Sequence, residues 1–169
     1  VATGLSFHQG RVLCEADCTA VGIDGIVAAG DVAAWRDAWT GRPRHLEHWS
    51  HAVEMAQAAA ATLLAGSAPH PLYDPVPTFW TDQWDLRIRS AGRPEDATSL
   101  AVIEEDAERG WLVVEGEHAG RLVCALTINA GGAHRQYQRA LAAQRTSQTA
   151  LTIPSIGGDH ATASGHQPV

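Results

Sequence analysis

The stretch "GIVAAGDVA", residues 25–33, decides how the first part of the chain is expected to fold. It is a compact apolar run closed by Gly30 and Asp31, and it follows "GRVLCEAD" (10–17), which alternates as a short strand does. A buried strand that ends in Gly-Asp places a carboxylate at the carboxyl edge of a sheet, where open α/β folds bind their ligands. We therefore expect two short adjoining strands. At Asp31 we expect either an acceptor for a sugar or polyol hydroxyl or a plain strand-to-turn aspartate.

The segment that follows predicts a loop and then a helix. Residues 32–44 contain Gly41 and Pro43 and are expected to form a loop. From Glu47 to Leu64 the alanine-rich string has high helix propensity and no proline, and Gly66 follows it as a stop signal. Its narrow alanine face predicts that this helix packs closely against a sheet or another helix.

The second half of the chain has the pattern of a separate α+β unit. Residues 66–77 hold four of the eight prolines and are expected to form an extended connector, so we place a domain boundary after residue 76. Several antiparallel strands followed by one helix are predicted for 77–145. The polar stretch 146–169 has no sustained period and is expected to be disordered. The predicted fold class is therefore α/β for 1–76 plus α+β for 77–145.

Length and composition limit the classes of protein that fit. With 169 residues, 45% of them hydrophobic, the chain can build one ordinary core and a small second unit. It has no apolar run of about 18 residues and no secretory pattern at its start, which predicts a soluble, cytoplasmic protein without a membrane partner. The basic residues are all arginine and unclustered, and with a net charge of -7 we expect no nucleic-acid partner. Since the chain begins with Val and an element follows almost at once, we expect it to be a piece of a longer protein.

Three histidines near the start of the helix raise the question of a metal site: His45, His48 and His51. On a helix their side chains fan over the surface, so only neighbouring pairs could share a metal, and the H-E-x-x-H pattern is missing. We predict no metal site and keep metal binding as an alternative. A C-x3-C pair without a matching second half does not suit zinc, so free, buried or half-buried thiols are expected at all three cysteines, namely Cys14, Cys18 and Cys124.

Three ordered motifs give the chain a family resemblance. The string "GLSFHQGRVLCEADCTAVGIDGIVAAGDVA" contains an A-x-G-D-V/C-A motif at Ala28 to Ala33, and an E-x-W-x-x-A segment follows at Glu47 to Ala52. A Pro-x-(F/W)-W-S-D-Q-Y signature is matched by Pro77 to Trp84, with Thr81 for Ser and Trp84 for Tyr. In order and spacing up to about residue 145, the chain resembles the ferredoxin reductase group of pyridine-nucleotide-dependent flavoproteins, which includes putidaredoxin reductase and the reductases of aromatic-ring dioxygenases.

The resemblance implies a set of residues that contact FAD. Asp31 would accept a hydrogen bond from a ribityl hydroxyl, and the backbone around Val32 would line the cofactor. The helix that begins near Glu47 would direct its positive end at the N1 and C2=O edge of the flavin, where negative charge develops on reduction. Trp49 would lie beside the ring. The cofactor-binding residues implied in this way are Gly30, Asp31, Val32, Glu47, His48, Trp49, Ala52, Phe79 and Trp80, and the resemblance assigns no catalytic side chain.

The resemblance also implies a reaction and its partners. Members of the group pass a hydride from NADH or NADPH to FAD, and electrons then leave singly to a ferredoxin-type iron–sulfur protein. The family seats its dinucleotides on G-x-G-x-x-G turns, and no G-x-G occurs in these residues. We therefore expect the chain to supply the last part of a Rossmann-like FAD domain and the small C-terminal domain, to need the missing N-terminal FAD/NAD portion, and to be inactive alone.

A second interpretation stays open. The α+β unit could serve as a non-catalytic interaction or dimerisation module that forms a homo-oligomer, with a vestigial FAD segment ahead of it. Flavin uptake in the presence of the N-terminal portion would favour the reductase, and self-association without flavin uptake would favour the module.

Overall fold

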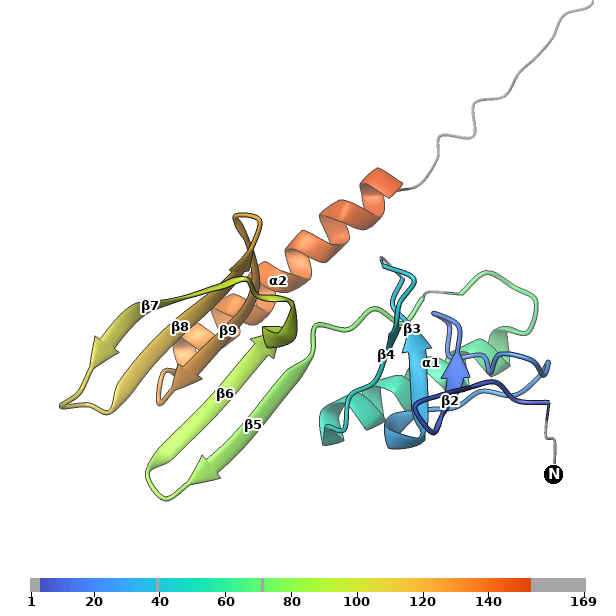
Figure 1. The fold of residues 1–169 in the computed structure, drawn as a ribbon, viewed down its shortest axis with the longest axis horizontal. Helices are drawn as coiled ribbons and strands as arrows, with labels where there is room; N and C mark the ends of the chain where they lie inside the picture. Colours follow the sequence, from blue (N-terminus) through green and yellow to red (C-terminus); the bar gives the residue numbers. More distant parts are fainter. Residues whose placement is uncertain (1–3, 39, 71, 153–169) are drawn as a thin grey trace, which may run out of the picture.

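The chain folds into two units that lie side by side and are joined by an extended connector (Figure 1). The computed structural model describes residues 4–38, 40–70 and 72–152. The first unit contains a four-stranded sheet and the helix α1, and the second contains a five-stranded sheet and the helix α2. Among the described residues, neither helix is long and apolar enough to cross a membrane.

The sheet of the first unit is small and mostly antiparallel. Its order is β1 (Phe7–His8), β2 (Arg11–Cys14), β3 (Ala33–Arg36) and β4 (Pro43–Arg44). Only β2 and β3 run parallel, with Val12 opposite Ala33. The mixed α/β character of this unit is as predicted, whereas its assignment to a Rossmann-like FAD domain stays a prediction.

The strand predicted for 25–31 is wrong. This segment makes one isolated bridge, from Val27 to Thr19, and ends in the 3-10 turn η1 (Gly30–Val32). The second strand is β3, which lies inside the region predicted as a loop, as does β4. Gly25 and Gly30 have φ angles of 75° and 74°, which interrupt an extended run, so the next apolar residues pair with β2 instead.

The predicted helix is confirmed as α1 (Trp49–Ala65). His48 is its N-cap residue, and Gly66 ends it with a φ of 58° and a hydrogen bond from its N–H to the Thr62 carbonyl. The buried face of α1 repeats every three or four residues and packs on Trp35 and the cysteines of the first unit. That face consists of His51, Met55, Ala59 and Thr62.

The second unit has the predicted architecture of antiparallel strands followed by a helix. The strand order is β5 (Thr78–Gln83), β6 (Leu86–Gly92), β9 (Arg121–Ile128), β8 (Trp111–His118) and β7 (Ser99–Asp106), with the 3-10 turn η2 (Pro94–Asp96) after β6. The helix α2 (Gly131–Thr152) packs on β6 and β9 across one face of this sheet (Figure 1). The core between them is formed by Ala91, Val113, Ala125, Thr127 and Leu141.

The predicted disorder from residue 146 is wrong for 146–152, because α2 continues to Thr152. The rest of that prediction, 153–169, lies outside the described residues. The connector 66–77 runs between the two units, where buried Tyr73 ties it to the first unit through a backbone hydrogen bond to the Ala16 carbonyl. The domain boundary after residue 76 stays a prediction.

Candidate functional site

Asp31 lies in the turn that packs against the beginning of α1. Gly30 is buried with a φ of 74°, and a Cβ atom added to it would lie 3.3 Å from the Cβ of Ala52 in the first turn of the helix. A larger residue would push η1 away from α1, so glycine permits this close approach. The neighbouring Asp31 and Val32 are exposed. An exposed carboxylate and the start of a helix are thereby held together.

The start of α1 carries no internal cap. His48 is extended, its side chain makes no capping hydrogen bond, and the first turn contains no acidic residue. The first N–H groups of a helix have no acceptor within the helix, and they carry its positive end. This end of α1 therefore suits an acceptor atom with partial negative charge.

Aromatic side chains from the two units meet at this end of α1. The rings of Trp49 and Trp80 lie 6.2 Å apart at an interplanar angle of 84°, and those of His48 and Phe79 lie 5.2 Å apart. The Ser50 hydroxyl donates to the Thr78 carbonyl over 3.3 Å and joins α1 to β5. The aromatic residues remain open on one side, because Trp49 is 73%, Trp80 45% and Phe79 43% exposed.

Glu47 lies just ahead of this helix and pairs with Arg11 of β2. The pair anchors the segment before α1 to the first sheet. All nine predicted cofactor-binding residues therefore lie in η1, around the start of α1, or on β5.

The three histidines point into different surroundings. His51 is buried, with its Nδ1 atom 2.8 Å from the Tyr73 hydroxyl and its ring 4.8 Å from that of Trp35. His48 faces Phe79, and His45 is exposed ahead of the helix. In the part of the chain that the structure describes, no three His, Cys, Asp or Glu side chains are arranged to hold a metal ion.

Comparison with known proteins identifies the family. Residues 78–155 match the reductase C-terminal family. The chain is 31% identical to the 3-phenylpropionate/cinnamic acid dioxygenase ferredoxin–NAD(+) reductase component of Photorhabdus laumondii, over 79% of this chain and 32% of that protein. It is also 31% identical to the anthranilate 1,2-dioxygenase system ferredoxin–NAD(+) reductase component of Burkholderia cepacia, over 92% of this chain and 37% of that protein.

Solved structures agree with these relatives. The crystal structure of Fdr9 matches with a TM-score of 0.72 and 28% identity, over 83% of this chain and 36% of Fdr9. This chain corresponds to the C-terminal portion of a ferredoxin reductase. The covalent putidaredoxin reductase–putidaredoxin complex shares the fold, with a TM-score of 0.71 and 21% identity over 83% of this chain and 32% of that one. The resemblance inferred from the three motifs is confirmed, and the chain spans about a third of the length of the curated relatives it matches.

The cysteines of this ferredoxin reductase portion are free and buried, as predicted. Burial raises the pKa of the thiols of Cys14 and Cys124, and it raises the pKa of Cys18 to about 12. A thiol that stays protonated is a poor nucleophile and a poor metal ligand. These residues therefore act as small packing groups.

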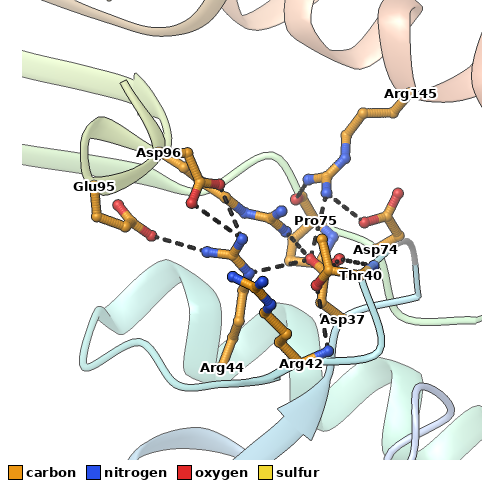
Figure 2. Close-up of polar contacts among 10 residues, drawn as sticks. Asp37, Thr40, Arg42, Arg44, Asp74, Pro75, Glu95, Asp96 and Arg145 are labelled. Atoms are coloured by element: carbon orange, nitrogen blue, oxygen red, sulfur yellow. Dashed lines mark hydrogen bonds and ion pairs between the residues drawn. The ribbon is translucent and has the colours of Figure 1, made fainter. Parts of the chain in front are cut away.

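The sequence prediction missed a cluster of charged residues centred on Asp37 (Figure 2). Asp37 follows β3, is 1% exposed, and accepts hydrogen bonds from the Thr40 backbone N–H at 2.9 Å and the Thr40 hydroxyl at 3.1 Å. Its other carboxylate oxygen lies 2.7 Å from Arg93, 3.4 Å from Arg44 and 3.9 Å from Arg145. Asp37 lay in the predicted loop 32–44, and the only signal for it was an aspartate shortly after the apolar run 32–35, with Arg36 between them.

Proposed function

We propose that this chain supplies the part of an FAD-dependent NAD(P)H:ferredoxin oxidoreductase that encloses the flavin from the C-terminal side. One observation carries the proposal. An exposed aspartate, an uncapped helix start and half-exposed aromatic side chains from both units converge at the same end of α1.

The residues at this end suit the polar part of FAD. Asp31 would accept a hydrogen bond from a ribityl hydroxyl, and Gly30 lets the turn approach the helix closely enough to share one ligand with it. The backbone of Val32 and the side chain of Ala52 would line the cofactor. Glu47 would keep the segment before the helix in place through its pair with Arg11.

The aromatic residues suit the flavin ring. Trp49 would lie beside the ring, and Trp80, which meets Trp49 edge to face, would form part of the wall, since both indoles leave much of their surface open. Phe79 would close the wall, with His48 behind it. Together these side chains would keep water away from the ring, and the free N–H groups of α1 would stabilise negative charge at the N1 and C2=O edge.

When bound, FAD would supply the chemistry of accepting a hydride from NAD(P)H and passing electrons on one at a time. The missing N-terminal FAD/NAD portion would supply the remaining contacts for both nucleotides. A ferredoxin-type iron–sulfur protein would receive the electrons, and the relatives support this because they are ferredoxin–NAD(+) reductase components. We expect the chain by itself to show no NAD(P)H-dependent reduction of ferredoxin.

The test is a chimera in which this chain replaces the C-terminal third of the Photorhabdus laumondii relative. The chimera should retain FAD, seen as flavin absorbance after gel filtration, and Asp31→Ala should weaken FAD binding by about 10- to 100-fold, since a hydrogen bond to a charged acceptor contributes about 1.5 to 3 kcal/mol. Asp24→Ala is the matched control, because Asp24 is also exposed but lies outside the proposed site. Equal FAD affinity in both variants would refute the role of Asp31.

A second candidate function rests on the edge strand β7. Leu100, Val102 and Ile103 are 70%, 60% and 52% exposed on this strand, which favours contact with another protein. If the chain is the interaction module, it should self-associate in sedimentation experiments, and the chimera should take up no flavin.

A further inference from the structure

The Asp37 cluster joins the two units of the chain. Asp37 belongs to the first unit, while Arg93 precedes η2 and Arg145 lies on α2 in the second. Arg145 also pairs with Asp74 at 2.6 Å and donates to the Pro75 carbonyl, both in the connector. The buried Asp37 carboxylate therefore joins the first unit to two separate segments of the second, and Arg145 extends the cluster to the connector (Figure 2).

In a second set of ion pairs between the units, the arginine belongs to the first unit and the carboxylates belong to the second. Arg44 on β4 of the first unit lies 2.9 Å from Asp96 and 3.4 Å from Glu95, both in η2 of the second. Arg44 also lies beside Asp37. The two sets thus share Arg44 and form one connected network.

The Asp37 carboxylate opposes the positive charges of this network. Burial lowers the pKa of Arg145, the Arg93 guanidinium lowers it further, and the carboxylates of Asp74 and Asp37 act against both effects. Without the Asp37 carboxylate, the guanidinium groups of Arg44, Arg93 and Arg145 would share a poorly hydrated space with less opposing charge. A buried ion pair that loses one partner leaves a strongly unfavourable charge behind, so the units would be pushed apart.

Outside this network, the contact between α1 and β5 is small. Among the described residues it includes the two ring pairs and the Ser50 hydroxyl, which lies 3.3 Å from the Thr78 carbonyl oxygen and 3.5 Å from the Thr78 hydroxyl. Trp49, Trp80 and Phe79 stay exposed over 73%, 45% and 43% of their surface. Such a contact has little buried area with which to fix the angle between the units. The ionic network is the stronger constraint on that angle.

We propose that Asp37 is a positioning residue that fixes the angle between the two units and thereby holds Phe79 and Trp80 of β5 against the start of α1. The role of this positioning in forming a wall of the flavin site rests on the proposed function. The effect of Asp37 on the angle between the units does not depend on that function. The Trp49–Trp80 pair reports the angle directly, because one indole belongs to each unit.

The experiment measures the exciton couplet of the Trp49–Trp80 pair by far-UV circular dichroism on this chain without cofactor. Trp80→Phe defines the spectrum without the pair. In Asp37→Asn the couplet should fall to the level of Trp80→Phe while the helix signal stays unchanged. Asp37→Glu keeps the negative charge and should keep most of the couplet. Asp106→Asn is the matched control, because Asp106 pairs with Arg109 inside the second unit, and it should keep the couplet.

A full couplet in folded Asp37→Asn would overturn the proposal. If Asp37→Asn does not fold, Asp96→Asn decides, because Asp96 is at the protein surface and its pair with Arg44 crosses between the units. A weakened couplet with an unchanged melting temperature supports the positioning role, and an unchanged couplet overturns it. FAD uptake by the chimera is measured separately, so failure of the flavin proposal leaves this result intact.

Discussion

Buried His51 should make the stability of the chain depend on pH. Its ring lies between Trp35 and Tyr73, and its pKa is lowered from 6.5 to about 4, mainly by burial and to a smaller extent by His48, against an opposing effect of Asp31. The folded chain therefore keeps this ring neutral. The unfolded chain takes up a proton near pH 6.5.

The sign of the effect follows from proton binding. Between pH 6.5 and about 4 the unfolded state binds more protons than the folded state, so the free energy of unfolding falls as the pH falls. The free energy of unfolding falls by roughly 1.4 kcal/mol per unit of pH over this interval, so about 3 kcal/mol is lost by pH 4. Above pH 6.5 the contribution of His51 no longer changes.

The assay is urea unfolding at a series of pH values from 7 to 4.5, followed by tryptophan fluorescence. His51→Gln keeps a polar group near the Tyr73 hydroxyl but does not titrate, so its stability should fall less steeply with pH than that of the parent. His118→Gln is the control, because His118 is exposed on β8 and its removal should leave the slope unchanged. Parallel curves for the parent and His51→Gln would refute the reasoning.

Two further outcomes are expected from packing. Gly92→Ala should destabilise the second unit by more than about 3 kcal/mol in thermal unfolding, because the new Cβ would lie 2.1 Å from the Val123 carbonyl oxygen and 2.8 Å from the Cys124 Cα. Gly120→Ala has a similar positive φ and no atom within 4 Å, so it should cost only about 1 kcal/mol, and equal losses would contradict the clash. The buried cysteines should resist a thiol reagent in the native chain and react fully in denaturant, so rapid native labelling would contradict their burial.

The elements that the sequence predicted well are those with local signals. The helix α1 is specified by an uninterrupted run of strong helix formers and by Gly66, whose positive φ ends it. The strands of the second unit are short runs rich in Val, Ile, Leu and Trp that are separated by acidic or glycine turns, so local sequence is enough to indicate them. The partner of β2 could not be predicted in this way. Both 25–31 and β3 are apolar, and only long-range pairing decides which of them lies beside β2.

The error in that choice explains why one aspartate was predicted and the other was missed. Asp31 closes one apolar run and Asp37 follows another after Arg36, and no local pattern tells which of the two carboxylates is buried. In the structure Asp31 precedes β3 in an exposed turn, whereas Asp37 follows β3 and occupies the carboxyl edge expected for Asp31. That edge position is buried because Arg93, just before η2, and Arg145 of α2, both remote in the sequence, close over it. The carboxylate at the sheet edge thus pairs with the second unit, and the exposed carboxylate beside α1 is the one available to a ligand.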